Sequence, residues 1–240
     1  MKQLKLFYKQ GEPKEIESLP DILPGFHTMG QYPGDFGKYT DDMWRKTWSG
    51  LHLSTRKLKE LEVPAQWILD EQKRCNVPVH YFSHTTAALE SDKLYRPPFH
   101  LQCEYSFLCR KDILESVWLL NEPTINIFGK KTRNPTRELD LSESGRSWHR
   151  RAWFADHFGK ENYTDRQMSS VELFFPPRGV QKLDIFVYPD YAERYLNGYL
   201  IKRSEKDLDF EYRILATLIV NNTSSGDADW NIKKLAIKKL

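Results

Sequence analysis

The sequence predicts an α+β fold: a mostly antiparallel sheet, short helices packed on it, and a Pro/Gly-rich N-terminal arm. Two segments, residues 210–220 and 100–109, alternate apolar and polar residues with the period of a strand. Three shorter stretches elsewhere in the chain space their apolar residues as helices do. A content of 40% hydrophobic and 13% aromatic residues supports a real core, which excludes wholesale disorder. We expect a single α+β domain over residues 41–240, preceded by the arm over residues 1–40.

The arm is predicted from its prolines. Pro13, Pro20, Pro24 and Pro33 recur among several glycines, and this spacing denies both a helix and a central strand. An extended arm either wraps its own domain or reaches a protein partner. Its anchors in both cases are the aromatic residues Phe26, Tyr32, Phe36 and Tyr39.

Three helices are expected in the domain. Asp41 or Asp42 caps a first helix that contains Met43, Trp44, Trp48 and Leu51. Residues 65–75 form a second helix, closed by Asn76 and Pro78. Residues 113–120 form a third, capped by Asp112 and stopped before Pro123.

The remaining elements are strands. Residues 79–88 and 124–128 are strand-like, and residues 170–175 and 182–188 form a hairpin around the turn at Pro176–Gly179. Residues 191–202 fit either a helix or a strand. The strand over residues 210–220 is expected to be central, because Leu215 and Ile219 make its second face apolar as well.

Basic residues gather in two places although the net charge is only +3. Residues 129–151 lose apolar residues and are predicted to be a charged loop, and residues 230–240 form a basic closing segment after Trp230. Basic charge beside apolar anchors suits a phosphate backbone or anionic lipid, and a solvated surface is the plainer interpretation. The residues assigned to binding a membrane or nucleic acid are Lys130, Lys131, Arg133, Arg137, Arg146, Arg150, Arg151, Lys233, Lys234, Lys238 and Lys239, with Trp230 added to the partner-binding set.

Enzymatic motifs are weak. His52 and His84 each begin a His-x-Ser/Thr tripeptide, the pair that two-histidine phosphoesterases use as base and acid, so a phosphodiesterase or nuclease is the alternative function. Glu172 and Asp184 on the predicted hairpin lack the Glu-x-Lys that a metal-dependent nuclease needs. We therefore assign no catalytic residue, metal or cofactor from the sequence, and lean away from an enzyme.

The last sixty residues resemble the C-terminal part of rhabdovirus matrix proteins. The resemblance rests on Leu183-Asp-Ile-Phe-Val-Tyr, on Leu218-Ile-Val, and on Ser225-Gly226 followed by Trp230. It implies a non-enzymatic α+β protein that self-associates, binds a nucleoprotein or nucleic acid, and contacts an anionic membrane surface.

The leading hypothesis is therefore a viral matrix-like binding and assembly protein. After the enzyme alternative, a third class of function is a purely structural subunit held in an assembly by its arm. The polar start and the odd number of cysteines, Cys75, Cys103 and Cys109, indicate an intracellular, cytoplasmic protein, with membrane surfaces or virions as further places.

Overall fold

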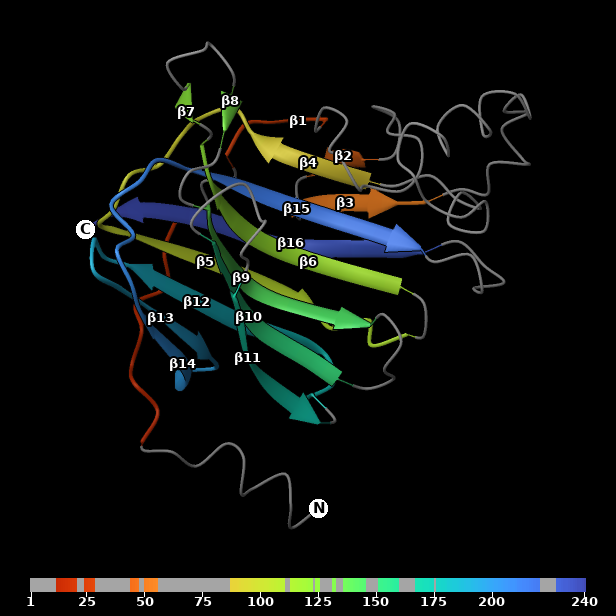
Figure 1. The fold of residues 1–240 in the computed structure, drawn as a ribbon. Coiled ribbons are helices and arrows are strands. Elements are labelled where there is room, and N and C mark those ends of the chain that lie inside the picture. The colour runs from red at the N-terminus through yellow and green to blue at the C-terminus, as the bar shows by residue number, and fades with distance from the viewer. Residues whose placement is uncertain are drawn as a thin grey trace.

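The fold is all-β in the part of the chain that the computed structural model describes, so the α+β prediction is wrong. Two seven-stranded antiparallel sheets stack face to face in this part, with no helix between or around them (Figure 1). The described residues are 12–20, 24–28, 44–47, 50–55, 87–110, 113–122, 124–125, 131–132, 136–145, 151–159, 167–174, 176–220 and 228–240.

We name the two sheets the front sheet and the back sheet. The front sheet has the order β1-β4-β15-β6-β9-β10-β11 and the back sheet β14-β13-β12-β5-β16-β3-β2. The strands of the front sheet are β1 (Phe26–Thr28), β4 (Ala87–Ser91), β15 (Tyr212–Val220), β6 (Ile113–Asn121), β9 (Thr136–Gly145), β10 (Arg151–Gly159) and β11 (Gln167–Phe174). Those of the back sheet are β14 (Tyr199–Glu205), β13 (Tyr191–Leu196), β12 (Val180–Val187), β5 (Phe99–Ser106), β16 (Asp229–Lys239), β3 (Gly50–Ser54) and β2 (Trp44–Thr47), while β7 (Thr124–Ile125) and β8 (Lys131–Thr132) pair separately.

The core lies between the sheets and explains why β6 is a strand. Ile113, Val117 and Leu119 alternate along β6, and all three are fully buried in the core. Leu114, Trp118 and Leu120 occupy the opposite face, so the segment is apolar on both sides and also satisfies helical spacing. Pairing with β15 and β9 on its two edges decides for the strand.

The other sequence-predicted elements divide into correct and incorrect ones. The strand over residues 210–220 is confirmed as β15, which lies between β4 and β6 inside the front sheet, and the strand over residues 100–109 is confirmed as β5 except for residues 107–109, which lie beyond its end. The first predicted helix is instead the β2–β3 hairpin. Its Gly50 has a φ of 125°, which favours glycine, and a side chain at this position would also meet the backbone of β16. The helix over residues 65–75 lies outside the described residues.

Two further predictions along the chain are wrong. The charged loop over residues 129–151 contains β9, a strand that pairs with both β6 and β10. The hairpin around residues 176–179 does not form: among the described strands β11 pairs with β10 alone, and the chain then crosses to β12 in the back sheet. Such crossings between two stacked antiparallel sheets give a jelly-roll-like sandwich.

The N-terminal segment 12–20 lies on the outer face of the back sheet. Leu19 is buried and its N–H donates to Oε1 of Gln102 at 3.1 Å, while Lys182 Nζ donates to the carbonyl of Ile16 at 2.8 Å. This part of the predicted arm therefore wraps its own domain. Among the described residues, no helix is long and apolar enough to span a membrane.

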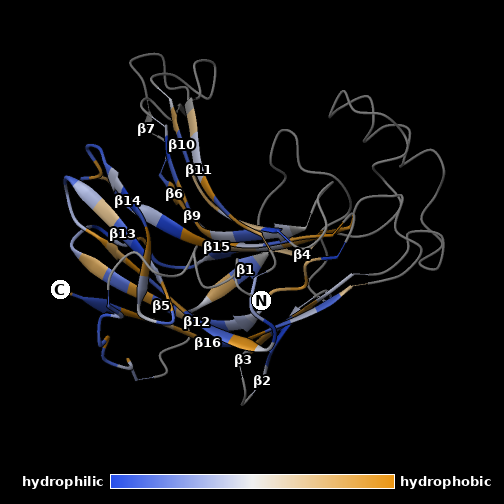
Figure 2. Ribbon diagram, turned by 90° about the horizontal axis from the view of Figure 1, so that it is seen from below, coloured by the Kyte–Doolittle hydropathy of each residue, from blue (hydrophilic) through white to orange (hydrophobic). Residues whose placement is uncertain are grey.

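The front sheet curves, and its face turned away from the back sheet is concave (Figure 2). We call this surface the concave face. Side chains reach it from alternate positions of each strand, opposite to those that enter the core. It is the surface on which the candidate site lies.

Candidate active site

A bulge in β9 brings three carboxylates to the concave face. Trp118 of β6 pairs with Asp140 while Val117 pairs with Ser142, so Leu141 is an extra residue in β9. Ser142 bonds the hydroxyl of Tyr105 in the back sheet, which places Ser142 on the core side. Without the bulge Glu143 would share that side, since it is five residues from Glu138.

The neighbours of Glu143 fix its direction. The hydroxyl of Ser144 bonds both the backbone N–H of Cys109, at 3.0 Å, and the fully buried Glu115 on the core side. Because Ser142 and Ser144 both face the core, Glu143 faces the other way, as do Glu138 and Asp140. The six residues Glu138-Leu-Asp-Leu-Ser-Glu143 therefore present three acids on one surface and bury two leucines below it.

His157 of β10 stands beside two of the acids. Its Nε2 lies 3.5 Å from Oε1 of Glu138 and 3.3 Å from Oδ2 of Asp140, and all three side chains are buried. One imidazole facing two carboxylates balances at most one negative charge. The cluster is therefore suited to proton chemistry, and its ligand atoms also lie within 4.8 Å of one another, as a metal site would require.

Two tryptophans flank the acids on the concave face. Trp118 pairs with Asp140 across β6 and β9, and it packs on Ala88, Leu120 and Leu215. Trp153 pairs with Glu143 across β9 and β10. Both indoles are half-buried, so each offers an apolar surface next to a carboxylate.

Polar contacts between side chains lie at both ends of the concave face. Toward β11, Nε1 of Trp153 donates to Oε1 of Glu172 at 2.8 Å, and Arg151 Nη1 donates to Oε2 of Glu172 at 3.1 Å. Toward β1, His27 contacts Asp92 at 2.9 Å and Glu90 at 2.8 Å. The hydrogen bond to Asp92 is the largest cause that raises the pKa of His27, and Glu90 adds to it against the opposing effect of partial burial.

The residues predicted as basic binding sites do not gather on one described surface. Arg137 donates to the carbonyls of Asp207 and Gly159, Arg151 lies on the concave face, and Lys234 and Lys238 contact the N-terminal segment. Lys233 and Lys239 are exposed on β16, and Lys131 is in β8. Lys130, Arg133, Arg146 and Arg150 lie outside the described residues, so their role stays a prediction.

The predicted aromatic anchors are placed only in part. Phe26 is buried in the core at β1, and Trp230 is 2% exposed with its ring 4.9 Å from that of Tyr105. Tyr32, Phe36 and Tyr39 lie outside the described part of the chain.

The histidines of the alternative enzyme hypothesis form no described site. His52 contacts Asp229 at 3.3 Å, and His84 is outside the described residues. Glu172 and Asp184 belong to different sheets, and Asp184 is buried against His100 and Gln102.

Sequence reasoning missed Glu138, Asp140, Glu143 and His157. The available signal was Glu-Leu-Asp-Leu, an alternation of acids and leucines inside a stretch that was interpreted as a basic loop. A strand with acids on one face and leucines on the other is a half-buried strand, so this alternation indicates the strand and the shared face of Glu138 and Asp140.

Comparison with known proteins identifies the fold. No model of a known protein family matches the sequence, and no curated protein sequence does. Solved structures do match: a LamA variant from Z. galactanivorans, in complex with laminaritriose and laminaritetraose, is 11% identical with a TM-score of 0.64 over 89% of this chain and 91% of that one. The laminarinase catalytic domain from Thermotoga maritima is 15% identical with a TM-score of 0.64, over 87% and 84%.

A third similar structure is the glycoside hydrolase family 16 endo-glucanase from Bacteroides ovatus, 8% identical with a TM-score of 0.63 over 89% of this chain and 94% of that one. These neighbours overturn the resemblance to rhabdovirus matrix proteins. The predictions of a non-enzymatic assembly protein, of self-association, of nucleoprotein, nucleic-acid or membrane partners, and of a nuclease as the alternative are wrong for the same reason. At these identities the likeness shows the fold: the chain has the β-sandwich of these glucanases.

Proposed function

We propose that the protein is a glycoside hydrolase that cleaves internal linkages of a β-glucan. The observation that carries the proposal is the row of Glu138, Asp140 and Glu143 on the concave face, between Trp118 and Trp153. Glycoside hydrolysis needs one carboxyl group that donates a proton to the leaving oxygen and a second that acts at the anomeric carbon. A strand that presents both to a sugar laid on the indoles meets this need.

Glu143 is assigned as the proton donor. It is only half-buried, so it reaches both the solvent and the oxygen of the linkage, and it returns as the base for the incoming water. Its proton passes to the glycosidic oxygen as the bond from that oxygen to the anomeric carbon breaks. The chain end that leaves departs as an alcohol.

Glu138 is assigned as the nucleophile. Its side chain is 10% exposed at the floor of the face, so a ring resting on the face meets the carboxylate directly, without a water layer between them. A bond from its oxygen to the anomeric carbon forms, and water deprotonated by Glu143 then displaces it, with retention of the anomeric configuration. Asp140 and His157 hold Glu138 in position from the same cluster.

The size of the concave face and the similar solved structures indicate the substrate class. The face spans the seven strands of the front sheet, roughly 30 Å at about 4.8 Å per strand, which is room for several sugar rings. One structural neighbour is a laminarinase and another an endo-β-1,3-glucanase from Pyrococcus furiosus. A β-1,3-glucan is therefore the first substrate to test.

The test is the release of reducing ends from a β-1,3-glucan and a mixed-linkage β-glucan. We expect Glu143→Gln and Glu138→Gln each to lower the rate by about 10²–10⁴-fold, because each removes an acid–base or nucleophilic role. Glu104→Gln, on the outer face of the back sheet, is the matched control and should keep the wild-type rate. Proton NMR of the first product should show the β-anomer.

Two results would contradict the proposal. One is a wild-type protein that releases no reducing ends from either glucan. The other is full activity in the Glu138 and Glu143 variants. Loss of activity with EDTA and recovery with a divalent cation would instead assign Glu138, Asp140 and His157 to a metal.

A further inference from the structure

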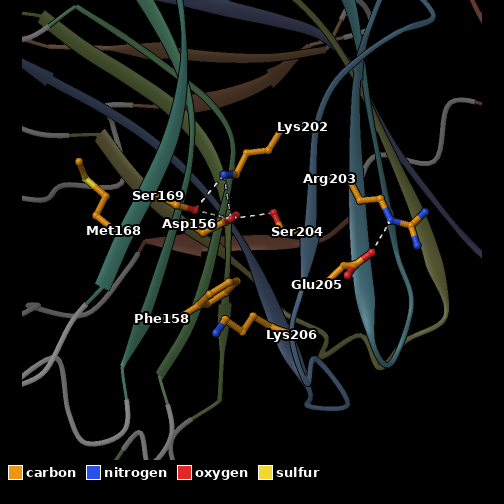
Figure 3. A pocket seen from close by; sticks show the side chains of 9 residues that line it. All are labelled: Asp156, Phe158, Met168, Ser169, Lys202, Arg203, Ser204, Glu205 and Lys206. Atoms are coloured by element: carbon orange, nitrogen blue, oxygen red, sulfur yellow. Dashed lines mark hydrogen bonds and ion pairs between the residues drawn. The ribbon is translucent and has the colours of Figure 1, made fainter. Parts of the chain in front are cut away.

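A second hollow lies between the sheets, away from the concave face. It has a volume of about 290 Å³ and opens at the edge where β10 and β11 face β14 (Figure 3). Asp156 on β10 contributes to its wall, while the next residue, His157, belongs to the candidate active site on the opposite side of the same strand. The lining residues are Asp156, Phe158, Met168, Ser169, Lys202, Arg203, Ser204, Glu205 and Lys206.

The inner wall of this cavity carries more positive than negative charge. Asp156 is its buried carboxylate, and two cations contact it: Arg194, which is fully buried, and Lys202, whose Nζ is 3.1 Å from Oδ2. Burial opposes ionisation of Asp156, but Arg194, Ser204 and Lys202 outweigh it and lower its pKa. One ionised carboxylate therefore faces two cations.

The oxygens of Asp156 are already occupied. Ser204 Oγ donates to Oδ2 at 2.7 Å and Ser169 Oγ donates to Oδ2 at 3.1 Å, in addition to the two cations. Lys202 Nζ also donates to Ser169 Oγ at 2.9 Å. Both oxygens of Asp156 therefore already have partners. Nε of the buried Arg194 has no hydrogen-bond partner in the part of the chain that is described.

The outer wall adds a further cation. Arg203 pairs with Glu205 at 3.2 Å and with Glu193 at 2.7 Å, and Figure 3 shows the Arg203–Glu205 pair turned away from the hollow. Lys206 lies on the side of Phe158 opposite Asp156, and no carboxylate of the described residues forms an ion pair with it (Figure 3). Lys202 therefore shares its acid, Asp156, with Arg194, and Lys206 has no acid partner among the described residues.

We propose that this cavity binds a compact organic acid, with a carboxylate or sulfate ester at Lys202 and a ring against Phe158. Two largely buried cations, Arg194 and Lys202, face the single carboxylate of Asp156, and this excess positive charge favours an anion because unbalanced charge is costly away from water. The volume equals that of roughly ten waters at about 30 Å³ each, which is more than a bare inorganic anion fills. Phe158 supplies the apolar contact for the remainder, which suits an acidic sugar.

Calorimetric titration at constant ionic strength tests this directly. The probes are glucuronate and glucose 6-sulfate, with neutral glucose and sodium sulfate as comparisons. We expect saturable binding of glucuronate or glucose 6-sulfate, none of glucose, and at least tenfold weaker binding of inorganic sulfate. Glucuronate alone would indicate a carboxylate ligand, and glucose 6-sulfate alone a sulfate ester.

Variants separate the cavity from other basic surfaces. Lys202→Met should weaken binding at least tenfold, while Lys206→Met, at an exposed side chain beyond Phe158, should weaken it less, and Lys239→Met on β16 should leave it unchanged. All three should keep the rate of glucan hydrolysis, because the cavity lies on the other side of β10 from Glu138 and Glu143.

The proposal is overturned if neither acid binds saturably to the wild-type protein, or if Lys202→Met binds the acids as tightly as the wild type does. Equal affinity for inorganic sulfate and the sugar acids would overturn the assignment of an organic ligand. Since these titrations do not need catalysis, they stand whether or not the protein hydrolyses a glucan.

Discussion

Glu115 is a fully buried carboxyl group between β5, β6 and β9, and it makes stability depend on pH. Burial raises its pKa to about 7, although hydrogen bonds from Ser144 and from the backbone N–H of Leu108 oppose the shift. An unfolded glutamate has its pKa at 4.5. Between these two values the folded protein holds a proton that the unfolded chain releases, so stability falls as the pH rises through this range.

We predict that Glu115→Gln removes this loss. The amide keeps an oxygen for Ser144 and Leu108 and carries no charge, so the decrease in unfolding free energy from pH 4.5 to pH 7.5 should shrink by about 3 kcal/mol. Urea unfolding at the two pH values measures it. Glu205→Gln, an exposed carboxyl on β14, is the control and should behave as wild type. An unchanged pH dependence in Glu115→Gln would contradict the assignment.

At the scale of single residues, the sequence shows which side chains are acidic but not which face of the strand each one points to. Glu138, Asp140 and Glu143 are visible as acids, yet simple alternation puts Glu143 on the face opposite to Glu138. Only the extra residue at Leu141 reverses this, and no side chain in the segment announces a bulge. The alternation pattern therefore could not predict the site, although the same pattern indicates the strand.

The bulge makes an element-scale prediction. Deleting Ser142 leaves Glu-Leu-Asp-Leu-Glu, in which strict alternation keeps all three acids on the concave face and both leucines in the core. The hydrogen bond between Ser142 and Tyr105 is lost, at a cost of about 1 kcal/mol. We expect this variant to fold and to hydrolyse the glucan within roughly 10²-fold of wild type, since a small displacement costs about that much.

The matched variant inserts an alanine between Ser142 and Glu143. It moves the Glu143 carboxyl to the core side, and hydrolysis should fall as far as in Glu143→Gln. Reducing-end assays measure both variants, with far-UV circular dichroism to confirm that each folds. Equal activity in the deletion and the insertion would mean that the bulge does not set the direction of Glu143.

Strands were predictable where one face was apolar throughout. The strand β15 was found because Tyr212, Ile214, Ala216 and Leu218 alternate without interruption. The strand β6 was taken for a helix because apolar residues on both faces fit either period, and its true state follows from pairing with β15 and β9. β9 was taken for a loop because the charges around it dominate its composition.

At the scale of the molecule, strand partners are the least predictable feature. β11 and β12 are consecutive and joined at Pro176–Gly179, which indicates a hairpin locally, yet they belong to different sheets. Nothing between residues 174 and 180 encodes that separation. It depends on distant strands, β10 and β5, that pair with each of them.

The two sheets are tied together at this end by Asp156 of β10 and Arg194 of β13. Arg194 is fully buried, Asp156 is 2% exposed, and Arg194 also donates to the carbonyl of Ala155 at 3.2 Å. Removing one partner of a buried pair strands the other charge away from water. We therefore predict that Asp156→Ala lowers the unfolding free energy by about 3–5 kcal/mol, measured by urea denaturation.

Two further variants separate this cause from a general loss of packing. Asp209→Ala removes the partner of Arg96 in an exposed pair and should leave the unfolding free energy nearly unchanged. The double variant Asp156→Ala, Arg194→Met removes the fully buried guanidinium and leaves only Lys202, which is 9% exposed, without its carboxylate, so it should be more stable than Asp156→Ala alone. If the double variant is instead less stable than the single one, the stranded guanidinium is not the source of the penalty, and Arg194 stabilises the sandwich mainly through its packing and its bond to Ala155.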